Sequence, residues 1–109
     1  KNAERQAVKE KEMNKVQNAQ TVEITKDGFL PNDLTISVGT TVIFINKDSV
    51  SHWPASGVHP THDVCKGFDA LAPVASGGTY SHTFNEVKVC PIHDHMNPSL
   101  KGKITVVEK

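Results

Sequence analysis

The sequence has no excess of charge of either sign and no long apolar run. Its 109 residues contain 12 Lys and Arg against 12 Asp and Glu, so the net charge with neutral histidines is zero. A nucleic-acid-binding surface needs a basic excess, which this composition does not supply. No stretch approaches the roughly 20 apolar residues of a membrane-spanning helix. We therefore expect no nucleic-acid partner, and membrane contact only through a tether that precedes residue 1.

The sequence also lacks the motifs of common enzymes. Nothing in it resembles a Ser/His/Asp constellation, a glycine-rich loop that cradles phosphate or the paired carboxylates of a hydrolase. A chain of this length suits one domain with its own core. These absences favour a single-domain binding protein over an enzyme.

The chain divides into a polar segment and a strand-rich domain. Residues 1–20 are charged and nearly free of large apolar side chains, which predicts a helical or disordered tether, with a partner-binding helix as the alternative. Residues 21–109 form the predicted domain, in which apolar residues recur with the period of two typical of strands. The predicted strands are residues 21–25, 34–38, 41–45, 79–84, 87–94 and 102–107. Residues 49–78 form a long loop rich in Pro, Gly, Ser and His, and loops of that length are usually functional.

Histidines are concentrated in one part of the domain. All six fall between residues 52 and 95. If His93-Asp94-His95 is extended, both imidazoles face one side, within reach of a single ion, and Asp94 faces the other. Imidazole suits copper, zinc, nickel and iron. The predicted metal ligands are His52, His59, His62, His93 and His95, whereas His82, in the middle of a predicted strand, is expected to be structural.

Two separated segments resemble the small cupredoxins. Residues 29–46, FLPNDLTISVGTTVIFIN, are similar to the first half of that family, and His52 follows where its first copper ligand belongs. Residues 80–84 through 102–106, YSHTF to GKITV, resemble the last hairpin. The resemblance covers residues 21–109 and implies an all-β, cupredoxin-type Greek-key β-sandwich with an N-terminal helical or flexible extension. It also implies copper as the cofactor.

The ligand set that the resemblance implies depends on the register of the last hairpin. Cys90-Pro-Ile-His93-Asp-His-Met96 matches the Cys-x2-His-x2-Met of blue-copper proteins, which would make Cys90, His93 and Met96 ligands. Counting ten residues from Phe84 and eight back from Gly102 instead places Asp94 at the thiolate position. We favour this second register. Asp94 then serves as a partner that orients a ligand histidine, as a ligand or as a strand-end cap, in that order.

This register leaves Cys90 available for a disulfide with Cys65. An exported domain readily oxidises such a pair, and the alternative is two unrelated buried thiols. His59-Pro-Thr-His62 and His93-Asp94-His95 also resemble, in miniature, the H-P-x-H and H-C-H motifs of multicopper oxidases. That similarity supports ligation by histidine alone, without implying oxidase activity.

Three functions remain open from the sequence. The leading hypothesis is a periplasmic or extracellular copper-binding protein for resistance, storage or delivery, with a histidine-dominated site. The first alternative is an electron carrier with Cys90 as its thiolate ligand. The second is a small copper enzyme that acts on oxygen or nitrogen-oxide species. The expected partners are the copper ion itself and a redox or copper-delivery protein.

Overall fold

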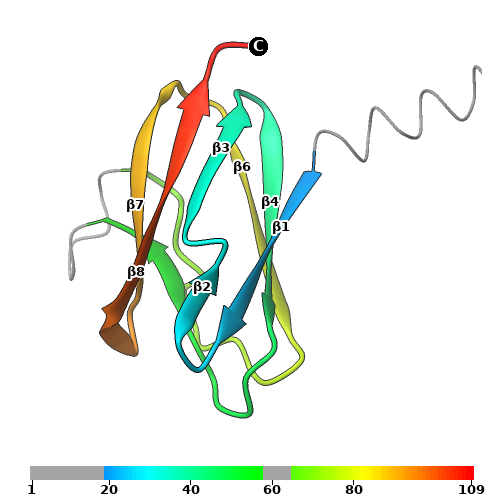
Figure 1. Cartoon of the computed structure of the whole chain (residues 1–109), viewed down its shortest axis with the longest axis vertical. Coiled ribbons are helices and arrows are strands. Elements are labelled where there is room, and N and C mark those ends of the chain that lie inside the picture. Colours follow the sequence, from blue (N-terminus) through cyan, green and yellow to red (C-terminus); the bar gives the residue numbers. More distant parts are fainter. Residues whose placement is uncertain (1–18, 58–64) are drawn as a thin grey trace, which may run out of the picture.

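Two four-stranded sheets pack face to face in a computed structural model that describes residues 19–57 and 65–109 (Figure 1). The strands are β1 (Ala19–Thr25), β2 (Gly28–Leu30), β3 (Asp33–Ser37), β4 (Thr40–Asn46), β5 (Pro54–Ser56), β6 (Thr79–Phe84), β7 (Lys88–Asp94) and β8 (Asn97–Val107). One sheet has the order β2-β1-β4-β6 and the other β3-β8-β7-β5. Strand β1 runs parallel to β4, and β3 runs parallel to β8, while the other neighbours are antiparallel.

Alternating side chains on the strands produce the core between the sheets. Along β4 every second residue is buried, from Thr40 through Val42 and Phe44 to Asn46. Phe44 lies at the centre, 5.5 Å from the ring of Phe68 and 6.2 Å from that of Phe29. Burying one such side chain stabilises the fold by about 1.5–3 kcal/mol. The period of two that predicted the strands is therefore the pattern that closes the sandwich.

The predicted fold class is confirmed, and the differences lie in short or bent segments. Strands β2 and β5, of three residues each, are too short to show a period and were not predicted. Strand β8 begins at Asn97, before the expected residue 102. Strands β3 and β4 follow one another through a turn at Gly39, whose φ of 91° suits glycine, but they belong to different sheets. The predicted tether over 1–20 falls almost wholly outside the described residues.

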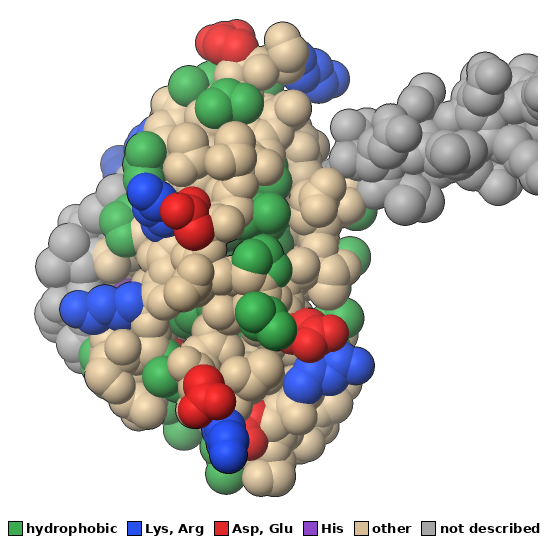
Figure 2. All heavy atoms as spheres, viewed as in Figure 1, with side chains coloured by type: hydrophobic (Ala, Val, Ile, Leu, Met, Phe, Trp, Pro, Cys, Tyr) green, Lys and Arg blue, Asp and Glu red, His purple; other side chains and the backbone are tan. Residues whose placement is uncertain are grey.

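The surface agrees with the balanced composition. Acidic and basic side chains lie next to one another on the face seen in Figure 2, and Lys103 and Asp33 approach within 3.8 Å on neighbouring strands. Within residues 19–57 and 65–109, no helix is long and apolar enough to cross a membrane.

A disulfide joins Cys65 to Cys90, with 5.8 Å between their Cα atoms. Both residues are buried, and Cys90 lies in the middle of β7. The bond therefore fastens the segment before Phe68 to the second sheet. The bond uses both cysteines of the sequence, so no free thiol remains.

Breaking this bond should destabilise the domain. The cysteines are 25 residues apart, and closing a loop of that length contributes about 3 kcal/mol. We expect Cys65→Ser to lower the free energy of unfolding by about that amount in a urea titration. The oxidised wild type should show no thiol in guanidinium, whereas Cys65→Ser should show one. Two titratable thiols in oxidised wild-type protein would contradict the disulfide.

Candidate functional site

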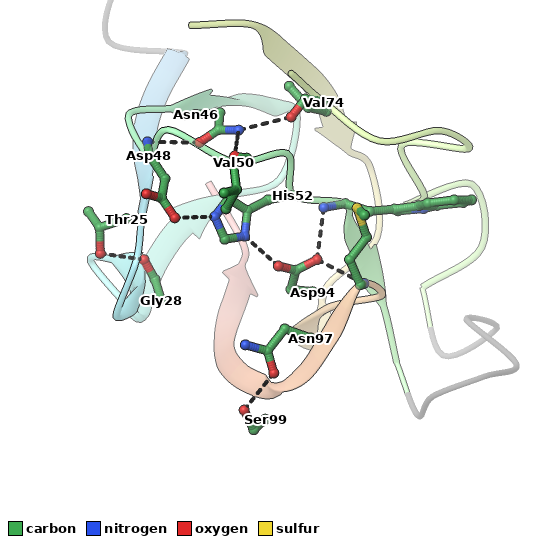
Figure 3. Close-up of polar contacts among 12 residues, drawn as sticks. Thr25, Gly28, Asn46, Asp48, Val50, His52, Val74, Asp94, Asn97 and Ser99 are labelled. Carbon is green, nitrogen blue, oxygen red and sulfur yellow. Dashed lines mark hydrogen bonds and ion pairs between the residues drawn. The ribbon is translucent and has the colours of Figure 1, made fainter. Parts of the chain in front are cut away.

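The candidate site lies at the end of the sandwich where β4 leaves one sheet and β7 ends in the other (Figure 3). Asn46, the last residue of β4, organises the loop that follows. Its side-chain amide donates to the carbonyls of Val50 and Val74, and its Oδ1 accepts from the N–H of Asp48. These bonds fix the loop that carries Asp48 and His52.

His52 is buried between two carboxylates. Its Nδ1 lies 2.5 Å from Oδ2 of Asp94, and its Nε2 lies 2.8 Å from Oδ2 of Asp48. A neutral imidazole has one N–H, so only the protonated ring can donate to both carboxylates. Burial alone would lower the pKa of His52, but the hydrogen bonds to Asp48 and Asp94 outweigh it and raise this pKa above 6.5. The same contact with His52 lowers the pKa of Asp48, with a smaller contribution from the N–H of Ser49.

Asp94 also ends strand β7. Its Oδ1 accepts from the backbone N–H of Trp53 at 2.8 Å and from that of Met96 at 3.0 Å. The pairing register with β8 shifts between His93 and Asp94, and both consecutive side chains are buried. The carboxylate points toward His52 in Figure 3. Asp94 thus both orients a histidine and caps the strand, two of the three roles considered from the sequence.

The other two described histidines of the predicted site lie next to Asp94. His93 is 2% exposed and pairs across the sheet with Ala55 and Lys101, whereas His95 follows the end of β7 and donates its backbone N–H to the carbonyl of Trp53. Their ring centroids are 6.3 Å apart, with an angle of 53° between the planes. The expected proximity of this pair is therefore present.

The structure does not assemble the whole predicted ligand set. His59 and His62 lie outside the described residues. Within residues 19–57 and 65–109, no group of three or more His, Cys, Asp or Glu side chains is placed to hold a metal. Of the alternative ligands, Cys90 is disulfide-bonded and Met96 is 52% exposed.

Two acidic residues at the site were missed by sequence reasoning. Asp48 binds His52 from four residues away, and Asp69 accepts a 2.6 Å hydrogen bond from Nε1 of Trp53. The i, i+4 spacing of Asp48 and His52 is a signal in a helix, but here both lie in a loop. For Asp69 no local signal exists, because its contact spans 16 residues.

His82 has the structural surroundings expected for it. On β6 its ring stacks on Phe68 at 5.4 Å and meets Phe84 edge-on at 4.7 Å. Burial lowers the pKa of His82, because desolvation disfavours the charged ring. The pKa values of His82 and His52 are thus shifted in opposite directions.

NMR titration of the metal-free protein should therefore find His52 protonating above pH 6.5 and His82 below it. A raised pKa means that the His52 contribution to stability is complete below pH 6.5 and is lost as pH rises through the folded pKa. The lowered pKa of His82 reduces stability as pH falls below 6.5.

Asp94→Asn should cost about 1.5–3 kcal/mol of unfolding free energy. It should move the pKa of His52 toward 6.5 and leave that of His82 unchanged. An unchanged His52 titration in that variant would contradict the assigned pairing.

Known proteins resemble this chain in structure. No protein-family model and no curated protein sequence matches it. A purple cupredoxin from Nitrosopumilus maritimus is 28% identical, with a TM-score of 0.70 over 81% of this chain and 99% of that one. A reduced amicyanin variant is 27% identical, with a TM-score of 0.69 over 83% of each chain.

A larger protein contains a similar unit. The copper-containing nitrite reductase from Thermus scotoductus SA-01 is 27% identical, with a TM-score of 0.70. The match covers 84% of this chain but 23% of the reductase, so only part of that protein is similar. The two packed sheets and these structural similarities to cupredoxins support one conclusion. This chain has a cupredoxin-like fold.

Proposed function

We propose that this domain binds copper through a histidine-dominated site in which His93 and His95 are the central ligands. The observation that carries the proposal is the separation of 6.3 Å between their ring centroids. Two imidazoles that bind one ion through nitrogens at about 2.0 Å have centroids about 4.5–6.4 Å apart, depending on the angle at the metal. The pair therefore fits a shared ion with the rings on nearly opposite sides.

Copper is proposed because of the fold and the nature of its relatives. The similar proteins include a Cu(I) form of amicyanin and a copper-containing nitrite reductase. Imidazole is a suitable ligand for copper, and His59 and His62, which lie outside the described residues, are the proposed further ligands. When bound, copper would supply one-electron chemistry, while the protein's own groups hold the histidines in place.

In the proposed site, a carboxylate takes the position of the usual cupredoxin thiolate. Asp94 is the residue that the sequence register places there, and it is hydrogen-bonded to His52. An ion bound by both groups at about 2.0 Å would hold the two donor atoms about 2.8 Å apart or more. The observed 2.5 Å is shorter than that. His52 would therefore become a ligand only by exchanging Asp94 for the metal, and an electron carrier with Cys90 as ligand would require the disulfide to open.

The proposed role is copper handling outside the cytoplasm, either resistance, storage or delivery to a partner protein. A buried disulfide persists in an oxidising compartment, which supports a periplasmic or extracellular location. Residues 1–20 are proposed as the tether of the domain. The redox or delivery partner would meet the end of the sandwich that carries His95, which is only partly buried.

The Cu(II) protein should be nearly colourless. With Cys90 bonded to Cys65, no thiolate is available to produce an intense charge-transfer band. We expect only weak visible absorption and an EPR spectrum of nitrogen and oxygen ligands. Cys65→Ser, which frees Cys90, serves as the control and should remain nearly colourless if the metal binds at the histidines. An intense visible band in the wild type would restore Cys90 as a ligand and overturn the histidine-dominated site.

Loss of a strand-end histidine should weaken copper binding more than loss of a loop histidine. His93 and His95 are held by the backbone pairing of β7 and by the bond to Trp53. We expect His93→Ala and His95→Ala to lower copper affinity by more than about a hundredfold, since loss of an outer partner alone costs 10–100-fold. His62→Ala should cost less, and His82→Phe should cost nothing. Competition with a chelator measures all four, and wild-type affinity in His95→Ala would remove the pair from the site.

A further inference from the structure

The single tryptophan of the chain packs against His95. The indole of Trp53 and the imidazole of His95 have centroids 4.7 Å apart, with an angle of 50° between the planes. The backbones of the two residues are also joined, because the N–H of His95 donates to the carbonyl of Trp53 at 2.7 Å. His95 therefore cannot move far without moving Trp53.

Asp69 fixes the other side of the indole. Its Oδ1 accepts from Nε1 of Trp53 at 2.6 Å and from the N–H of Leu71 at 2.8 Å. The N–H of Asp69 in turn donates to the hydroxyl of Tyr80, whose ring stacks on Phe44 in the core. The position of the indole is thus set by the core of the sandwich.

We propose that Trp53 makes the copper site favour Cu(I) over Cu(II), an inference that rests on the proposed function. The 6.3 Å separation of the ring centroids of His93 and His95 suits Cu(I), which accepts two ligands on opposite sides. Cu(II) prefers four or more ligands, including water. An indole against His95 leaves less room for water on that side of the site.

The contact with Asp69 strengthens this preference. A tryptophan face attracts a nearby cation, and the attraction increases where water is excluded. Donation of the Nε1 proton to a carboxylate polarises the indole and makes its face more negative. The weakly hydrated Cu(I) ion gains more from such a face than Cu(II), which would give up bound water to approach it.

The test compares Cu(I) and Cu(II) affinities in the full chain, measured by competition with chelators specific for each state. We expect Trp53→Ala to lower the ratio of Cu(I) to Cu(II) affinity by about tenfold, the size of a partly desolvated cation–π contact. For a one-electron couple this change equals about 59 mV. Trp53→Phe and Asp69→Asn should lower the ratio by smaller factors. Val89→Ala, at an exposed position of β7, is the control and should not change it.

Two outcomes separate this inference from the proposed function. An unchanged ratio in a folded, copper-binding Trp53→Ala would overturn the role of Trp53 and leave the copper site intact. Absence of copper binding in the wild type and in Val89→Ala alike would overturn the proposed function itself. If Trp53→Ala does not fold, the affinity ratio of Trp53→Phe and the fluorescence of wild-type Trp53 test the role of Trp53 instead. One equivalent of Cu(I) should change that emission, and unaltered emission with copper bound would place the metal away from the indole.

Discussion

A fully buried carboxylate, that of Asp94, joins the parts of the molecule that make its functional end. One oxygen faces His52 on the loop after β4, and the other accepts the backbone N–H groups of Trp53 and Met96. A buried charge is tolerated only when it is paired and hydrogen-bonded, so these partners are required by the burial itself. The loop after β4, the start of β5 and the β7–β8 turn are therefore held in one arrangement.

In the proposed function, copper binds at His93 and His95, on either side of Asp94, the residue that the sequence register aligns with the usual cupredoxin thiolate. His52 is hydrogen-bonded to a carboxylate on each side, and the ring centroids of His93 and His95 lie 6.3 Å apart. The disulfide acts on the same strand, because it ties Cys90 of β7 to Cys65. Strand β7 thus carries the disulfide at its centre. At its end it carries the buried carboxylate of Asp94 and the proposed ligand His93.

The aromatic core extends into the site through Tyr80, Asp69 and Trp53. Tyr80 stacks on Phe44, receives the N–H of Asp69, and Asp69 holds the indole beside His95. Packing in the core therefore reaches the proposed ligand through three residues. Such a chain of contacts holds the indole of Trp53 more precisely than a surface loop would. The proposed preference for Cu(I) depends on that position.

The sequence by itself determined the sandwich, the disulfide pair and the segment that carries the candidate site. Strand periodicity is a local property, and the two cupredoxin-like segments fixed the register that singled out Asp94. The sequence did not determine which groups meet His52 and Trp53. Asp48 and His52 are near in sequence but meet in a loop that the hydrogen bonds of Asn46 shape, and Asp69 meets Trp53 from 16 residues away. Those contacts were decided by tertiary structure, because a hydrogen bond between distant residues depends on how the sheets and loops pack and leaves no local pattern.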